Sequence, residues 1–380
     1  AIGNTAVKNT IGDGNVLIGK ELTNASGKSN VVIGESMTTS NGNNNVLIGN
    51  SISNNTIPSS LPAYEMPTAG GNIIMGYDAI GVGAGQVVLG NLAGSLGAGN
   101  VVIGNGAGVA VATGAIAIGN GAATGAATGA IVIGNLAGTA GSAGAIAMGN
   151  EAATSDGSNQ IAIGNKVVAK EESTIAIGDS ATANSKGAVA VGSKTNATGE
   201  DSLALVSANA SGDFSIAIGS DAKAANYGSI ALGGNASSTG VNAIAIGMNT
   251  SANYNNSFVI GAGAIANGTG AGAIGHLANT QGKDAMAVGV QACAIGANSL
   301  ALGTTACSKG VDSIAIGYSS CASSTNSSAI GTNATANGTN SMAFGANALA
   351  SGTNSTAIGA NSFAEKTNSF VIGPNTTACG

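Results

Sequence analysis

The chain has 380 residues, of which 63 are glycine, 3 % are aromatic and 7 % are charged. A globular domain is about a quarter charged and fills its core with large side chains, whereas the apolar residues here are mostly Ala, Ile and Val. This composition excludes one wide globule and favours a structure that grows in one dimension. The net charge is −6 and every basic residue is a lysine, so no basic patch for nucleic acid is expected.

A glycine that follows a short apolar triplet recurs along the chain and divides it into repeats, which we call rungs. In the first part of the chain this glycine is found at Gly3, Gly19, Gly34, Gly49, Gly76 and Gly90. From Gly104 to Gly164 the spacing is 15, and over residues 219–373 it is 14; between them, Val206 replaces the glycine and one step is 13. We count about 26 rungs and expect one continuous array over residues 1–380, without a separate globular domain. Because the chain begins and ends within this pattern, we expect it to be an internal piece of a longer protein.

Residues 50–70 interrupt the period, because the step from Gly49 to Gly76 is 27, about one rung plus 13 extra residues. The interruption contains Pro58, Pro62 and Pro67. Proline cannot donate a hydrogen bond to a strand ladder, so we predict an inserted loop with Tyr64 at its crest. Loops on a rigid scaffold are common binding sites and also common neutral insertions, and the sequence leaves both interpretations open.

The residues between Asp78 and Glu151 include no charged side chain. Glycine recurs every few residues there and the apolar pattern has a period of two, which excludes a membrane-spanning helix.

Each rung has the pattern of two short strands joined by two turns. The first strand, such as Ile314-Ala315-Ile316, is rich in β-branched residues and alternates, and the glycine after it permits a tight corner. The second half, such as 334–336, alternates small and variable residues and ends in a polar turn such as 337–340. Two strands and two turns in 14 or 15 residues predict an all-β chain, a parallel β-solenoid whose coils stack in register about 4.8 Å apart.

The first strand of each rung is apolar on both faces, which is typical of a strand buried on both sides. In so thin a coil we expect the alanines of both strands to fill the interior, so the Ile/Val/Leu/Met row must be covered from outside. A bare stripe of that length would exceed what monomers tolerate, and we infer an obligate oligomer joined along the row. The residues that we assign to this seam are Ile314, Ile316, Phe258, Phe344 and Phe370.

The repeat N-S-x-A-I-G-x-N-A-x-A-x-G, found from Asn340 to Gly359 and around Asn326 to Gly338, resembles the head repeats of trimeric autotransporter adhesins (YadA-like heads). The resemblance covers nearly the whole chain, and residues 160–380 most closely. It implies a left-handed parallel β-roll, a homotrimer and an adhesive role at a bacterial surface. Similar repeats occur in phage and viral fibres, so a cell surface and a particle surface both stay open, as does a structural filament subunit.

Three cysteines, Cys293, Cys307 and Cys321, are 14 residues apart and therefore occupy the same position in consecutive rungs. Stacking would bring neighbouring Cα atoms to about 5 Å, within reach of a disulfide. We predict one bridge between adjacent rungs, with the third thiol free or bridged to another chain; a column of small, soft residues is the alternative. The same column continues at Ile265, Leu349 and Phe363, and either a partner or a neighbouring subunit would cover it.

Catalysis, cofactors and metal ions have little support. His276 is the single histidine, stands at a corner and has no carboxylate nearby in the pattern, so we expect a solvated turn residue. The glycine-rich segment from Gly81 to Gly85 is similar to a phosphate-binding loop, but no helix is expected after it, so we do not predict a phosphate site there. The spacing does not fit the hexapeptide repeat of β-helix acyltransferases, and the aspartates of calcium-binding β-rolls are missing. We predict a protein that is not an enzyme.

Outward positions of the second strand, such as Asn196, Lys223 and Thr335, are expected to contact the target together with the proline-containing loop. Matches to the glycosylation signal, for example at Asn196, Asn235 and Asn333, follow from an Asn- and Thr-rich composition. An ice-binding solenoid is a further alternative, but the mixed residues at outward positions do not form a regular threonine lattice.

Overall fold

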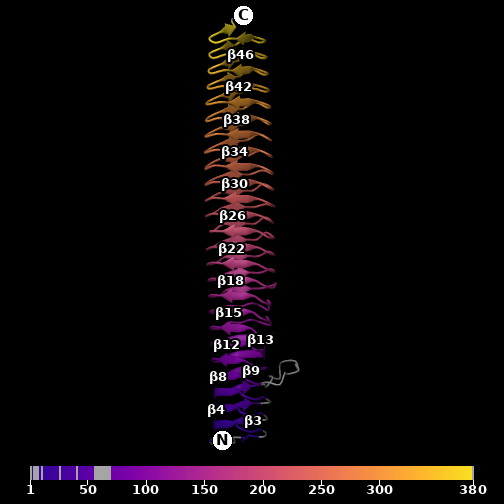
Figure 1. Ribbon diagram of the computed structural model, residues 1–380, viewed down its shortest axis with the longest axis vertical. Coiled ribbons are helices and arrows are strands. Elements are labelled where there is room, and N and C mark those ends of the chain that lie inside the picture. The colour runs from indigo at the N-terminus through magenta and orange to yellow at the C-terminus, as the bar shows by residue number, and fades with distance from the viewer. Residues whose placement is uncertain are drawn as a thin grey trace. The chain divides into compact units, whose positions relative to one another are not determined.

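The computed structural model describes residues 2, 8–9, 12–24, 27–39, 42–54 and 70–378. It forms two compact units, Ala1–Lys194 and Thr195–Gly380, which we call unit 1 and unit 2. No described residue is helical, and each unit consists of parallel strands that stack into two sheets (Figure 1). The predicted fold class, an all-β parallel solenoid, is therefore confirmed.

In unit 1 the first sheet is formed by the triplet that precedes each corner glycine. Its strands are β2 (Val16–Lys20), β4 (Val31–Glu35), β6 (Val46–Asn50), β8 (Ile73–Tyr77), β10 (Val87–Leu89), β12 (Val101–Ile103), β14 (Ile116–Ile118), β15 (Ile131–Ile133), β16 (Ile146–Met148), β18 (Ile161–Ile163), β20 (Ile175–Ile177) and β22 (Val189–Val191). The second sheet contains β1 (Lys8–Asn9), β3 (Thr23–Asn24), β5 (Thr38–Thr39), β7 (Ser53–Asn54), β9 (Ile80–Val82), β11 (Gly94–Ala98), β13 (Gly108–Thr113), β17 (Ala153–Thr154), β19 (Val168–Ala169) and β21 (Thr182–Ala183). Between β13 and β17, single bridges at Ala123 and Gly138 continue this second ladder.

Unit 2 repeats the same plan with more regular rungs. Its first sheet contains β24 (Leu203–Leu205), β26 (Ile216–Ile218), β28 (Ile230–Leu232), β30 (Ile244–Ile246), β32 (Phe258–Ile260), β34 (Gly272–Ile274), β36 (Met286–Val288), β38 (Leu300–Leu302), β40 (Ile314–Ile316), β42 (Ser328–Ile330), β44 (Met342–Phe344), β46 (Thr356–Ile358) and β48 (Phe370–Ile372). Its second sheet contains β23 (Asn196–Ala197), β25 (Asn209–Ala210), β27 (Lys223–Ala224), β29 (Ser237–Ser238), β31 (Ser251–Ala252), β33 (Ile265–Ala266), β35 (Asn279–Thr280), β37 (Cys293–Ala294), β39 (Cys307–Ser308), β41 (Cys321–Ala322), β43 (Thr335–Ala336), β45 (Leu349–Ala350), β47 (Phe363–Ala364) and β49 (Thr377–Ala378).

Neighbouring rungs pair in register, each residue opposite its equivalent. Ile314 of β40 pairs with Leu300 of β38, and Ala315 pairs with Ala301. Each strand therefore donates and accepts its backbone hydrogen bonds with the rungs before and after it, which satisfies the polar groups of a very thin coil.

The corner after each first-sheet strand depends on glycine. Gly317 has a φ of +127°, and a Cβ placed there would lie 2.5 Å from the carbonyl oxygen of Gly331 in the next rung. Only glycine combines that backbone conformation with such a close approach, as the sequence pattern predicts.

Asparagine often occupies the left-handed position that completes each turn. Asn333 and Asn340, one at each corner of a rung, have φ values of +55° and +56°. Asparagine tolerates this region better than most side chains, which accounts for its abundance in the turns. A buried serine before a first-sheet strand can help to close the turn: Ser313 Oγ donates to the carbonyl oxygen of Gly310 at 2.7 Å.

The interior of unit 2 is almost entirely alanine. Ala315 of the first sheet and Ala322 of the second are both fully buried, in a core cluster that contains nine further residues, all alanine except Val371. Small side chains allow the two sheets to approach closely, so a short coil can close around them.

Unit 1 departs from this expectation in its early rungs. Leu17 and Leu47 of the first sheet are buried together with Leu22 and Ile52, where alanine is the rule later in the chain. Buried asparagines accompany the larger residues, and Asn45 Nδ2 donates to Asn30 Oδ1 at 3.0 Å. The alternation predicts which residues face inward, but the interior of unit 1 is not filled by alanine alone.

The rung without a corner glycine makes a different turn. Val206 and Ser207 both adopt left-handed φ values, +62° and +56°. A regular corner uses a glycine near +130°, one intervening residue and then one left-handed residue, whereas here two consecutive left-handed residues suffice. The shorter corner explains the single 13-residue step.

Candidate functional site

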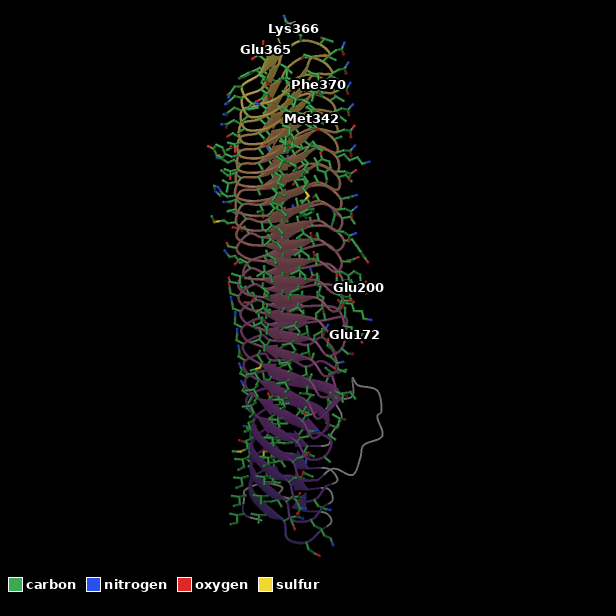
Figure 2. All side chains as sticks on the ribbon, turned by 45° about the horizontal axis from the view of Figure 1, so that its top comes forward. Glu172, Glu200, Met342, Glu365, Lys366 and Phe370 are labelled. Atoms are coloured by element: carbon green, nitrogen blue, oxygen red, sulfur yellow. The ribbon has the colours of Figure 1, made fainter. Side chains whose placement is uncertain are left out.

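The outer side of the first sheet carries two columns of mostly apolar side chains, which we call the first-sheet stripe. Its members stand at the first and third positions of each first-sheet strand, as Ile314 and Ile316 do in β40. Ala315 between them is fully buried, and successive side chains of a strand point to opposite faces, so the two isoleucines point outward. In the described strands of both units the stripe contains no charged residue. Figure 2 shows Met342 and Phe370 among the side chains of this stripe.

The three phenylalanines predicted for the seam also lie in the stripe. Phe344 and Phe370 expose 51 % and 66 % of their surface, which is unusual for so large an apolar side chain. Phe258 is more covered because its ring lies across Gly272 of the next rung, where any side chain would collide with it. All three point outward in the single chain, so their burial requires something outside it.

The outer side of the second sheet differs from the stripe in unit 2, because its residues are mixed. The column includes Asn196, Lys223 and Thr335, the residues that we expect to contact a target, and the lysine is exposed. It also includes apolar members such as Ile265 and Phe363, which are partly buried along their own ladder. The two faces of the coil in unit 2 are therefore chemically distinct: one is uncharged and mostly apolar, the other variable.

Side-chain ladders of asparagine run along the corners of unit 2. Asn333 Nδ2 donates to Asn347 Oδ1 at 3.1 Å, and Asn347 Nδ2 donates in turn to Asn361 Oδ1 at 3.1 Å. The opposite corner carries a second ladder of the same kind: Asn326, Asn340, Asn354 and Asn368. Sequence reasoning missed these ladders, although asparagine recurs there at the period of the rung. They tie neighbouring rungs together and leave a regular row of amides at the surface.

The three in-register cysteines lie on the outer side of the second sheet. Cys307 is the Cα partner of both Cys293 and Cys321, and all three are partly buried free thiols. The predicted bridge between adjacent rungs therefore stays a prediction.

A shallow apolar groove of about 370 Å³ lies on the second sheet of unit 1. It arises where the outward column runs through small residues, because Gly94 pairs with Gly108 and Gly108 bridges Ala123. Ile80, Leu96 and Val109 line its sides. The small residues can be found in the sequence. That they lie in one column and form a groove becomes clear only when the register of the rungs is known.

Chemically reactive groups are sparse over the described residues. His276 is exposed at a corner, as expected, and its carbonyl oxygen accepts a hydrogen bond from the Gln291 amide at 2.8 Å. In this part of the chain no three His, Cys, Asp or Glu side chains are grouped in a way that could hold a metal ion. Nor does it contain a helix that could span a membrane.

The proline-containing loop with Pro58, Pro62, Tyr64 and Pro67 lies outside the described residues. Of the glycosylation signals, Asn235 and Asn333 lie at exposed corners with left-handed φ values, and Asn196 is partly buried in β23.

Comparison with protein families gives one match, described as the YadA head domain repeat (2 copies). Eleven segments match it, most of them overlapping, and together they cover residues 169–264, 266–320, 322–348 and 350–376, which is more than half of the chain. The match bears out the resemblance read from the repeat. A comparison with curated proteins gave no match.

Proposed function

Because the chain belongs to the family of YadA head domain repeats, we propose that it forms the head of a homotrimeric adhesin that works at a cell or particle surface. The proposal includes a left-handed β-roll in which three chains share one axis. The head projects from the cell or particle that carries it, and its outward-facing residues bind a target.

The first-sheet stripe carries this proposal. An uncharged apolar row with exposed phenylalanines would be a liability on a single soluble chain, because apolar surface of this extent drives association. Three chains that turn their stripes toward a common axis would bury Ile314, Ile316, Phe258, Phe344 and Phe370 in one seam. The mixed second sheet would then face outward, where variable residues suit contact with a target.

Attachment by such a head is multivalent. Each rung presents a similar outward residue, and a trimer presents every rung three times, so weak contacts add up to a strong attachment. Asn196, Lys223 and Thr335 would contribute to this surface, together with the loop that contains Pro58, Pro62, Tyr64 and Pro67. Contact of this kind needs no chemical step, in agreement with a family and a fold whose role is structural.

The experiment compares fluorescent beads coated with the wild-type chain and with an Ile316→Asp variant that is designed to break the seam. Beads are washed over a cultured epithelial layer, over bare glass and over albumin-blocked glass. We expect the wild-type beads to adhere and the variant beads at equal coating density to adhere at least 10-fold less. Albumin-coated beads are the control, and wild-type beads that adhere no better than they do to the epithelial layer and to bare glass would contradict the adhesive role. Rods that join end to end in electron micrographs would indicate a filament subunit instead.

A further inference from the structure

The cysteine column of unit 2 is a set of three neighbouring thiols, not an isolated one. β37, β39 and β41 are adjacent parallel strands, and their cysteines are direct Cα partners. In-register parallel strands place such Cα atoms about 4.8 Å apart, inside the range of about 4.4–6.8 Å that disulfides span. The column faces away from the first-sheet stripe, so assembly along the stripe leaves it accessible.

The three thiols differ in what lies beside them. Two residues after each cysteine, just beyond the end of its strand, the chain carries Ile295, Lys309 and Ser323 in turn. Cys321 Sγ is 3.2 Å from Ser323 Oγ and so has a hydroxyl partner of its own. Lys309, on the middle rung, is the cation that acts on all three sulfurs.

The thiols are also ordered by their hydrogen bonds. The hydrogen bond from Cys307 lowers the pKa of Cys293 to about 7, with a smaller contribution from Lys309 and against a partial burial that raises it. The same bond raises the pKa of Cys307, and a hydrogen bond to Cys307 raises the pKa of Cys321 well above its usual range. The ladder therefore favours a thiolate at Cys293 and keeps Cys321 protonated. A thiolate, and not a thiol, is the nucleophile in exchange with a disulfide.

We propose that Cys293 and Cys307 form a thiol–disulfide exchange site that takes an external disulfide and closes a covalent staple between two adjacent rungs. The Cys293 thiolate attacks one sulfur of the external disulfide, which forms a mixed disulfide and releases the first thiolate. Cys307 then loses its proton and attacks Cys293 Sγ, which forms the Cys293–Cys307 bond and releases the second thiolate. Two protein thiols are oxidised, and the external disulfide is reduced to two thiols.

The disulfide would link two neighbouring rungs and so prevent them from separating. A solenoid is held together by contacts between neighbouring rungs, so it can open one rung at a time from a frayed end. A bond between β37 and β39 closes a loop of 14 residues and blocks that opening. Because Cys307 is shared by both possible pairs, only one staple forms, and Cys321 stays a thiol.

The positions of the lysines allow the disulfide to be mapped by tryptic digestion. Lys283, Lys309 and Lys366 are the lysines nearest the column, so trypsin releases peptide 284–309 with Cys293 and Cys307, and peptide 310–366 with Cys321. Native protein is incubated with oxidised glutathione, its remaining thiols are alkylated in denaturant, and the digest is weighed by mass spectrometry without reductant. We expect peptide 284–309 to be two hydrogens lighter and unalkylated, and peptide 310–366 to carry one alkyl group.

Three serine variants distinguish the roles of the three cysteines. Cys321→Ser should form the staple at the wild-type rate, and Cys307→Ser should accumulate one glutathione on Cys293 without closing. Cys293→Ser should consume glutathione disulfide at least 10-fold more slowly. Unchanged far-ultraviolet circular dichroism identifies the variants that keep the fold. Cross-linked peptides 284–309 and 310–366, bonds between chains that involve either of these peptides, or alkyl groups on all three of Cys293, Cys307 and Cys321 after incubation would each overturn the proposal.

Discussion

Gly233 and Gly234 are consecutive residues that meet very different surroundings, so a pair of alanine variants tests whether the corner glycines hold the rungs together. Gly233 has a φ of +131°, and a Cβ built on it would lie 2.6 Å from the carbonyl oxygen of Gly247. Gly234 lies outside the left-handed region, and its nearest neighbour would be the carbonyl oxygen of Ser220 at 3.9 Å, an ordinary contact. Only the first of the two requires glycine.

The expected cost of Gly233→Ala has two parts. A residue other than glycine in such a backbone region costs about 1–3 kcal/mol, and moving the next rung away from the new methyl group costs about 1–3 kcal/mol more. We therefore expect a local loss of about 2–6 kcal/mol. Gly234→Ala meets neither problem and should stabilise the chain by about 0.4–1 kcal/mol, because alanine reduces the freedom of the unfolded chain.

Hydrogen exchange on the β28 and β30 amides measures the effect where it arises, since a repeat array does not have to unfold in one step. A loss of about 2–6 kcal/mol corresponds to exchange that is roughly 30- to 20,000-fold faster. Thermal melting of both variants provides the second readout. Equal exchange in the two variants would refute the role assigned to the corner.

Three further predictions concern the ladder, the stripe and the thiols. Asn347→Ala removes both side-chain hydrogen bonds of Asn347 and places alanine at a φ of +55°, so we expect a loss of about 1–3 kcal/mol of stability. Asn347→Gly should lose less stability, because glycine tolerates the turn. Equal melting temperatures for the two variants would show that the turn conformation contributes nothing. Ile316→Asp should dissociate the oligomer in size-exclusion chromatography with light scattering, whereas Thr335→Asp on the second sheet should leave it intact; the reverse result would place the seam on the other face. Alkylation of Cys293 by iodoacetamide should rise with pH and reach half its maximum near pH 7, because its pKa is lowered to about 7, and a midpoint at the usual thiol value would contradict the hydrogen-bond ladder.

The features that follow from the rung period were predictable from the sequence. The alternation at Ile314, Ala315 and Ile316 predicts which side chains face inward, because a strand has only two faces. The recurrence of Gly317 and its equivalents predicts a corner, since only glycine adopts that backbone without cost. The repeat itself resembles a family, and the family comparison bears that out.

Features that depend on the exact path of the backbone were not predictable. Asn333 and Asn347 recur at the rung period, but their ladder requires left-handed turns that orient both amides along the stack. The missing glycine at Val206 indicates an irregular rung without revealing that two left-handed residues replace the corner. The burial of Leu17 and Leu22 in one interior depends on how the early rungs close, which the repeat pattern alone does not give. The order of the thiol hydrogen bonds depends on side-chain rotamers.

The mass of the native assembly tests most directly whether sister chains seal the apolar stripe. Light scattering on purified wild-type protein should give about three times the chain mass of 35.6 kDa at all concentrations measured. A folded, soluble species with the mass of one chain would contradict the account, because Phe344 and Phe370 would then be stably exposed to water.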